Sequence, residues 1–243
     1  MRIPLALAAT LAASIAAADI DEKVNAALAA DIRTEAETIR DANRKPLETL
    51  KFFGLSDDMH VLELFPGGGW YTKILAPVLA ENGRLAVSIF TQGAAAMAEE
   101  AGWDIDVIPN DDYQAVEGTR RFTMGSMDFG EAQFDMALTF RNMHNFTDDG
   151  RAMLNAAVFK SLKAGGLYGV VDHTRRHMQP ETGESWRRED PVRTIKEVQA
   201  AGFEFVDYSN LHYRPDDELR YEVGRKTVTG NTDRYTFLFR KPE

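Results

Sequence analysis

Apolar residues recur along the chain at two spacings, one typical of helices and one typical of strands. The segment 21–40 carries apolar side chains about four residues apart, which predicts an amphipathic helix covering another part of the fold; they are Val24, Leu28, Ile32, Ala36 and Ile39. A short helix is expected after Pro46, ending at Gly54.

From residue 61 onward, strand patterns alternate with helical ones. Short runs rich in apolar residues predict strands at 61–64, 84–89, 120–124, 134–140, 167–171, 203–206 and 235–239. Helices are expected between them at 70–81, 94–101, 151–163 and 191–201. The segment 104–113 fits neither pattern. Such alternation favours an α/β fold with a parallel sheet and helices on both faces.

Three finer expectations concern the second half of the chain. The run 120–124 would be the third strand of the sheet, ending at Gly125-Ser126. Gly165-Gly166 would cap the helix 151–163. Asp190-Pro191 would start the last helix, with Val192, Ile195 and Val198 facing inward.

The stretch VLELFPGGGWYT, residues 61–72, combines a buried strand, an acid and three glycines before a helix. Glycine lets backbone amides approach a ligand, and a helix start offers free N–H groups, so this arrangement is typical of a nucleotide site. A dinucleotide fingerprint would need glycine where Thr72 stands, and no Lys-Ser/Thr pair follows the glycines as a P-loop requires.

Composition narrows the class of protein. At 243 residues, with 44% hydrophobic and 27% charged residues, the chain suits one globular domain with a sizeable core. A net charge of -10 argues against a nucleic-acid partner, because such binding depends on clustered lysine and arginine. The chain has no cysteine, so disulfides are excluded.

The N-terminus has the pattern of a secretory signal. Arg2 precedes an apolar stretch, and Ala16-Ala17-Ala18 fits a cleavage site, so we expect cleavage after Ala18 and a periplasmic or secreted protein without a membrane span. An alanine-rich mature helix or a membrane anchor is the alternative. The predicted organisation is a signal peptide at 1–18, an N-terminal helical cover at 19–54 and the main domain at 55–243.

The glycine stretch resembles motif I of the class I S-adenosylmethionine-dependent methyltransferases. Glu63 stands at the family's acidic position, and Gly67 and Gly69 stand at its later two glycines. "FDMALTFRNMHNF" at 134–146 and "FKSLKAGGLYGVVDH" at 159–173 resemble the family's fourth and fifth strands, so the likeness covers about residues 45–241. The sequences of these motifs are similar to those of a subgroup of predicted bacterial methyltransferases with secretion signals.

This resemblance implies a three-layer Rossmann-like fold with a mostly parallel seven-stranded sheet and a C-terminal antiparallel strand. It also implies S-adenosylmethionine as the cofactor, bound by residues at the strand ends: Glu63, Phe65, Gly67, Gly68, Gly69, Tyr71, Ser88, Ser126 and Phe140. Two positions depart from the family. Phe65 replaces its first loop glycine, and its acid at the end of strand two, which holds the ribose, is absent.

Ligands of open α/β sheets bind at the carboxyl ends of the strands, which selects further candidates. His144 or His173 would act as a catalytic base, with Asp172 orienting either one. Arg141, Asn142 and Trp70 would bind the acceptor. His144 could instead cap a loop, His173 could be a buried, hydrogen-bonded structural residue, and Trp70 could pack the helix start. His173 and His177 are four apart, but no third metal ligand is evident, so no metal is expected.

Two functions remain open at this point. The first is methyl transfer from S-adenosylmethionine to a small-molecule acceptor. The second is an exported, non-catalytic protein of the same fold that binds an adenosyl-like or other small ligand. The missing ribose acid favours the second, while Arg141, Asn142 and His144 at one strand end favour the first. The sequence identifies neither the acceptor nor the oligomeric state.

Overall fold

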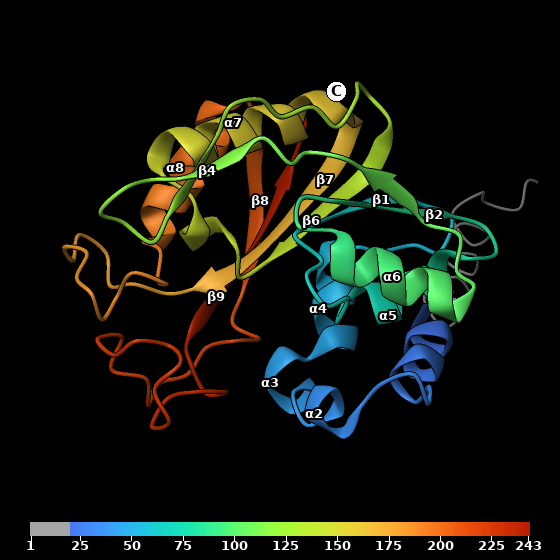
Figure 1. Ribbon diagram of the computed structural model, residues 1–243, viewed down its shortest axis with the longest axis horizontal. Helices are drawn as coiled ribbons and strands as arrows, with labels where there is room; N and C mark the ends of the chain where they lie inside the picture. The colour runs from blue at the N-terminus through green and yellow to red at the C-terminus, as the bar shows by residue number, and fades with distance from the viewer. Residues whose placement is uncertain (1–19) are drawn as a thin grey trace, which may run out of the picture.

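The computed structural model describes residues 20–243 as a twisted sheet with helices on both faces (Figure 1). The seven strands of the sheet lie in the order β3-β2-β1-β6-β7-β9-β8. All neighbouring pairs are parallel except those that β9 makes with β7 and β8, which are antiparallel. The strands are β1 (His60–Leu64), β2 (Arg84–Ser88), β3 (Asp106–Ile108), β6 (Phe134–Phe140), β7 (Leu162–His173), β8 (Glu204–Ser209) and β9 (Arg234–Arg240). The predicted mostly parallel sheet of seven strands with an antiparallel C-terminal strand is confirmed.

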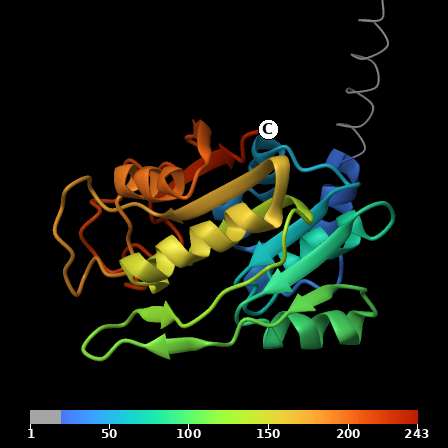
Figure 2. The same ribbon diagram turned by 90° about the horizontal axis from the view of Figure 1, so that it is seen from above.

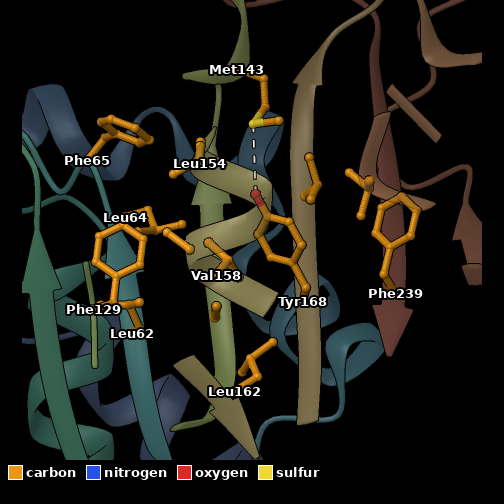
Figure 3. Packing of buried hydrophobic residues seen from close by; sticks show 14 of the residues in the cluster. Leu62, Leu64, Phe65, Phe129, Met143, Leu154, Val158, Leu162, Tyr168 and Phe239 are labelled. Atoms are coloured by element: carbon orange, nitrogen blue, oxygen red, sulfur yellow. Dashed lines mark hydrogen bonds between the residues drawn. The ribbon is translucent and has the colours of Figure 1, made fainter. Parts of the chain in front are cut away.

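Two groups of buried apolar side chains hold the helices to the two faces of the sheet. On one face, α7 (Asp148–Ser161) and α8 (Pro191–Ala200) contribute Leu154, Val158 and Val198 to a cluster that includes Tyr168 of β7 (Figure 3). On the other face, the helical residues 20–28, α4 (Pro46–Phe53) and α5 (Thr72–Leu79) pack against β1 and β6. Helix α6 (Gln92–Ala101) follows β2.

The predicted continuous helix over 21–40 is wrong. The first helix ends at residue 28, and the chain restarts as α2 (Glu35–Thr38) and then α3 (Asp41–Arg44). Thr34 and Glu37 form a capping box that begins α2, and such a cap favours a new helix start over a continuous helix. Ile39, expected to face inward, is 73% exposed. These short helices still cover the main domain.

The third strand of the sheet is β3, which falls in the segment 104–113 that the sequence pattern left unassigned. The run expected there forms β5 (Phe122–Met124), which pairs with β4 (Tyr113–Ala115) in a separate two-stranded sheet. Figure 2 shows this hairpin lying beside the main sheet. The predicted placement of 120–124 is therefore wrong, although it is a strand.

Two smaller expectations also need correction. Gly165 and Gly166 do not cap a helix, because α7 ends at Ser161 and β7 begins directly at Leu162, with Gly165 in a left-handed conformation at φ 74°. Asp190 does cap α8, accepting hydrogen bonds from the backbone N–H groups of Val192 and Arg193. Val192 itself is 38% exposed and does not face inward.

The loop 210–233 returns to the sheet near the N-terminal helices (Figure 1). Arg188 donates two hydrogen bonds to the carboxylate of Asp217, at 2.9 and 3.0 Å, and both side chains are fully buried. Arg234, at the start of β9, donates to the backbone oxygen of Asn43. The loop and the helical cover therefore meet at the same end of the sheet.

Between residues 20 and 243, no helix has both the length and the apolar character needed to cross a membrane. The predicted signal peptide at 1–18 lies outside the described residues.

Candidate functional site

A cavity of about 290 Å³ lies where β1 and β6 end, between the glycine turn and the N-terminal cover. Most of the predicted site residues line it: Glu63, Phe65, Gly67, Gly68, Trp70, Tyr71, Phe140, Arg141 and Asn142. The cover contributes Glu37, Arg40 and Arg44, and Pro66 completes the wall. Ligands of open α/β sheets bind at this position.

Backbone geometry explains the three glycines. Gly67 and Gly69 have φ values of 57° and 78°, a left-handed conformation that glycine adopts without strain. A Cβ at Gly67 or Gly68 would meet no atom within 4 Å, so these two glycines present bare backbone to the cavity. A Cβ at Gly69 would lie 2.5 Å from Cε of Met97. Gly69 therefore allows α6 to pack against the turn and does not line the cavity.

Phe65, at the position of the family's first glycine, also has a left-handed backbone, with φ 57°. Its buried ring contacts Phe146 at a centroid distance of 5.0 Å and Phe90 at 6.4 Å. Packing against two aromatic rings compensates for a conformation that is uncommon in a bulky residue. Phe65 therefore keeps the shape of the turn without glycine and forms part of the cavity wall.

Glu63 is the acid of the cavity. Its side chain is buried and accepts a hydrogen bond of 2.6 Å from the hydroxyl of Thr72. Burial raises the pKa of Glu63 to about 7, because a carboxylate loses its hydration there. A positively charged ligand group in the cavity would restore the ionised form.

The raised pKa of Glu63 predicts a pH-dependent stability. The folded protein holds a proton that the unfolded chain loses near pH 4.5, so this residue's stabilising contribution falls as pH rises toward 7. The variant Glu63→Gln keeps an acceptor for Thr72 and carries no charge. We expect it to exceed the wild type in unfolding free energy by about 3 kcal/mol at pH 8 and to match it near pH 4. Urea unfolding at pH 4 and pH 8 measures this difference in unfolding free energy. The same difference at both pH values would contradict the prediction.

Aromatic side chains form one wall of the cavity. The rings of Tyr71 and Phe140 stack with a centroid distance of 3.6 Å and an interplanar angle of 10°. The indole N–H of Trp70 donates to the backbone oxygen of Glu37 at 3.1 Å, which links the wall to the cover. The guanidinium of Arg44 lies 4.1 Å from the centroid of the Trp70 ring. The Trp70 ring therefore contacts a cation of the protein itself.

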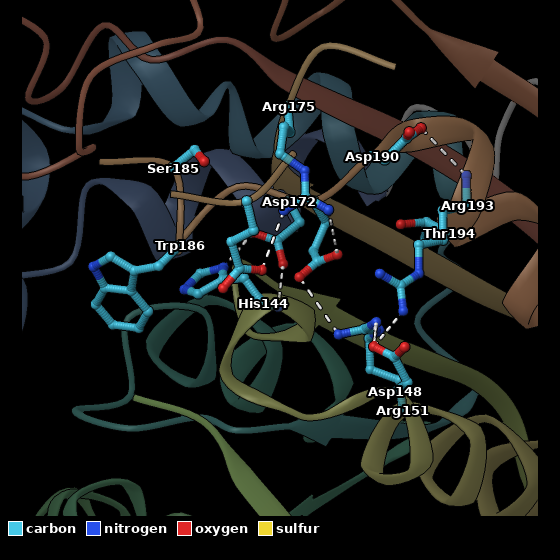
Figure 4. Close-up of polar contacts among 12 residues, drawn as sticks. His144, Asp148, Arg151, Asp172, Arg175, Ser185, Trp186, Asp190, Arg193 and Thr194 are labelled. Atoms are coloured by element: carbon cyan, nitrogen blue, oxygen red, sulfur yellow. Dashed lines mark hydrogen bonds and ion pairs between the residues drawn. The ribbon is translucent and has the colours of Figure 1, made fainter. Parts of the chain in front are cut away.

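His144 and Asp172 form a buried pair beside the cavity (Figure 4). Nδ1 of His144 lies 2.7 Å from one carboxylate oxygen of Asp172, and the backbone N–H of His144 donates to the other at 3.1 Å. This leaves Nε2 as the ring nitrogen that is not held by Asp172. Trp186 packs edge-on against the imidazole, at a centroid distance of 6.2 Å. Neither His144 nor Asp172 lines the cavity, although Asn142 does.

His173 lies close to this pair, with its ring centroid 5.9 Å from that of His144. Its Nδ1 is 2.9 Å from the hydroxyl of Thr232. Burial, together with nearby Arg234, holds the pKa of His173 well below its usual value. His173 is therefore neutral at physiological pH. The structure thus brings together the three predicted catalytic residues.

Two predicted cofactor residues lie away from the cavity lining. Ser88 is fully buried, donates to the backbone oxygen of Ile108 at 2.8 Å and accepts from Asn110 at 3.0 Å. A hydrogen bond from Ser88 to a ribose would require these contacts to rearrange. Ser126 is exposed and bonds to Asp112, because β5 is not part of the main sheet.

The sequence reasoning missed Glu37, Arg40 and Arg44, which line the cavity from the cover. Glu37 accepts two hydrogen bonds from Nζ of Lys73, at 2.8 and 3.0 Å, which fasten the cover to α5. The spacing of Arg40 and Arg44 in a short helical segment gives no indication of a site. Their role depends on how the cover packs against the turn.

Comparison with solved structures supports the class of fold. A S-adenosylmethionine-dependent methyltransferase from Aquifex aeolicus matches with a TM-score of 0.58 at 13% identity, over 83% of this chain and 92% of that one. The 1,6-didemethyltoxoflavin-N1-methyltransferase from Burkholderia thailandensis, solved with its substrate and S-adenosylhomocysteine, matches with a TM-score of 0.55 at 17% identity, over 100% and 92%. The [4+2]-cyclase SpnF matches with a TM-score of 0.59 at 16% identity, over 82% and 80%.

No family model and no curated protein matches the sequence. The strand order, the antiparallel β9 and these neighbours show that the chain has the fold of the class I S-adenosylmethionine-dependent methyltransferases. The predicted fold class is confirmed. The cyclase shows that this fold also supports other chemistry, so function has to be argued from the site.

Proposed function

We propose that this protein transfers a methyl group from S-adenosylmethionine to a small-molecule acceptor in the cavity at the ends of β1 and β6. The observation that carries the proposal is the bare backbone of Gly67 and Gly68, which faces the cavity beside the buried carboxyl group of Glu63. The Burkholderia neighbour, which acts on a small molecule and was solved with S-adenosylhomocysteine, is consistent with it.

The residues of the cavity fit the amino-acid half of the donor. The glycine turn offers close approach to backbone groups, and Glu63 favours a positive charge such as the donor's ammonium. The bound donor supplies a methyl group on a positively charged sulfur; an acceptor lone pair bonds to its carbon while the S–C electron pair returns to sulfur. The protein's part is to align the two reactants and exclude water.

We further propose that His144 removes the proton from an acceptor whose reacting atom carries one. Asp172 fixes the ring through Nδ1, so Nε2 is the atom that would take the proton. His144 is buried, packs against Trp186 and does not line the cavity, so transfer of the proton to Nε2 requires a local rearrangement. His173, neutral and bonded to Thr232, would position this pair.

A second candidate function is ligand binding without catalysis. It is favoured by the end of β2, where Ser88 is fully buried and already hydrogen-bonded, and where no acid is available for a ribose. The cavity lining does not include this strand end. A protein that holds an adenosyl-like ligand weakly, or another small ligand, would share the same fold.

Calorimetric titration of residues 19–243 with S-adenosylmethionine and S-adenosylhomocysteine tests the proposal. We expect micromolar binding that Gly67→Val abolishes, because a β-branched side chain is strained at positive φ and would fill the cavity. Gly118→Val is the matched control, since Gly118 also has positive φ and open surroundings but lies outside the cavity. A folded protein that binds neither ligand at millimolar concentration would favour the second candidate.

We also propose that the protein is exported after cleavage at Ala18. The support is the sequence pattern of residues 1–18 alone. Mass spectrometry of the protein recovered from the periplasm or medium of expressing bacteria should give a chain that begins at Asp19. Recovery of the uncleaved chain in the cytosol would contradict the proposal.

A further inference from the structure

Four arginines converge on the cavity and on a small chamber next to it, and we call them the arginine cluster: Arg40, Arg44, Arg141 and Arg234. They come from distant parts of the chain. Arg40 and Arg44 belong to the N-terminal cover, Arg141 follows β6, and Arg234 begins β9. Arg44 and Arg141 line both the cavity and the chamber, so the two spaces share a wall of guanidinium groups.

The arginine cluster has no acidic partner among residues 20–243. No carboxylate lies within 4.0 Å of any of its four guanidinium groups in that part of the chain. Arg44 and Arg234 are each only 6% exposed, and the Nε of each is buried without a hydrogen-bond partner. The one side-chain hydrogen bond of Arg234 goes to the backbone oxygen of Asn43.

Other buried arginines of the protein are paired. Arg151 bonds to Glu197 at 2.7 Å, and Arg188 bonds to Asp217 at 2.9 Å. The cluster is therefore an exception in a protein that otherwise neutralises its buried cations. An unpaired buried charge is strongly unfavourable, so its presence points to a partner that is not part of the described chain.

The acids nearest to the cluster are already occupied. Glu37 bonds to Lys73, and Glu63, which lines the same cavity as Arg44, accepts from Thr72. Burial raises the pKa of Tyr71 to about 12, so its hydroxyl is neutral. The carboxyl groups of Glu37, Glu63 and Asp172 act on the cluster only from beyond contact distance, so within residues 20–243 no guanidinium among the four is directly paired.

Mutual repulsion supports the same conclusion. Burial and then the charge of Arg141 lower the pKa of Arg44 to about 8, and burial followed by repulsion from other arginines lowers the pKa of Arg141 and of Arg234 to about 10. Positive charge is thus disfavoured at three neighbouring positions. A bound anion would remove this penalty.

We propose that the arginine cluster binds a carboxylate or phosphate group of the methyl acceptor, so that the substrate is an acid. The assignment of this anion to a methyl acceptor rests on the proposed function. The anion site itself is inferred from the arginine cluster alone. Guanidinium groups bind both kinds of anion through paired hydrogen bonds, which gives orientation as well as affinity.

The donor alone does not satisfy the cluster. Its amino-acid part has one carboxylate for four guanidinium groups, and its sulfonium adds a positive charge. Bringing this cation next to several guanidinium groups increases the positive charge of the site. An acidic group of the acceptor, bound in the cavity of about 290 Å³ that Arg40, Arg44 and Arg141 line, offsets this charge. The chamber beside it, of about 10 Å³, has room for no more than a water-sized group.

The test is calorimetric titration of residues 19–243, saturated with S-adenosylhomocysteine, with malonate and separately with inorganic phosphate. Malonamide is the neutral control ligand. At least one anion should bind, and Arg44→Gln or Arg141→Gln should each weaken its binding at least about tenfold, because both residues line the cavity and the loss is that of a charge-assisted hydrogen bond. Arg240→Gln should leave binding unchanged, because Arg240 is exposed and pairs with Glu204.

Thermal unfolding distinguishes a variant that has lost the anion site from one that is merely destabilised. Arg44→Gln removes an unpaired buried charge, so we expect its Tm to rise by about 2–4 °C although it loses anion binding. A purely structural Arg44, important only for its contact with Trp70, would give a lower Tm and unchanged anion affinity. That result would overturn the inference.

Further outcomes distinguish the two groups that could occupy the anion site, the donor's own carboxylate and an acidic acceptor. Binding of malonate that S-adenosylhomocysteine displaces would assign the cluster to the donor's carboxylate and overturn the acceptor assignment. A protein that binds S-adenosylhomocysteine but neither anion at millimolar concentration would overturn the inference and leave the proposed function standing. A protein that binds an anion but not S-adenosylhomocysteine would confirm the anion site and count against the proposed function.

Discussion

Replacing His144 by alanine is expected to lower kcat about 10²- to 10⁴-fold, the usual contribution of a positioned general base. Asp172 holds Nδ1 of His144 at 2.7 Å, so the ring has one fixed orientation and Nε2 is the nitrogen left for an acceptor's proton. The assay is release of S-adenosylhomocysteine in the presence of an acidic acceptor found by screening. The Kd of S-adenosylhomocysteine should be unchanged, because His144 does not line the cavity.

A matched control separates a catalytic role from a structural one. His60 lies at the amino end of β1, opposite the site, and its Nδ1 is 3.1 Å from the backbone oxygen of Gln133. His60→Ala should therefore keep full kcat. If His144→Ala also kept full kcat, the pair of His144 and Asp172 would serve only to hold the segment after β6.

Replacing Asp217 by alanine is expected to lower the free energy of unfolding by about 3–5 kcal/mol, because it leaves the buried guanidinium of Arg188 without its partner. Both side chains are fully buried, and Asp217 also accepts hydrogen bonds from the backbone N–H groups of Leu219 and Asp233. Urea unfolding measures the change.

The neighbouring Glu218 provides the control for this prediction. Its carboxylate pairs with Arg220 on the surface, where both side chains are more than half exposed, with 58% and 61% of their area open to solvent. Glu218→Ala should therefore change stability by about 0.5 kcal/mol or less. A loss below about 1 kcal/mol for Asp217→Ala would show that the buried pair does not hold the loop 210–233.

The parts of the fold that could be predicted are those with strong local patterns. The β1 strand, the glycine turn and α5 follow from apolar residues and glycines that are adjacent in the sequence. Long strands such as β6 and β9 were also predicted. The edge strand β3 has only three residues, of which Val107 is 45% exposed, so it lacks the apolar run that identifies a buried strand.

The site could be predicted only in part, and for a similar reason. Gly67, Phe140 and Arg141 line the cavity because they lie at or just after the ends of β1 and β6, which meet at one edge of the sheet. Arg40, Arg44 and Arg234 reach it through packing between the cover, the loop 210–233 and β9, which no local pattern records. Ser126 lies away from the site because β5 pairs with β4 in a separate sheet, and the apolar pattern of 120–124 does not distinguish such a strand from one of the main sheet.

Sequence and structure together also show how the cover depends on the main domain. Trp70 and Lys73 both bond to Glu37, so the segment that carries Arg40 and Arg44 is held over the glycine turn by residues of α5 and its start. The two short helices α2 and α3 place Glu37, Arg40 and Arg44 at the cavity.

The most direct test of methyl transfer in this cavity uses S-adenosylmethionine carrying a trideuterated methyl group. The protein is incubated with this donor and a panel of small carboxylic and phosphoric acids, and products are read by mass spectrometry. We predict a labelled methyl product and equimolar S-adenosylhomocysteine. Gly67→Val should form neither, and Arg44→Gln should form at least about tenfold less of both at subsaturating acceptor. Binding of the donor and of an acid without any labelled product would contradict catalysis and assign the protein to ligand binding.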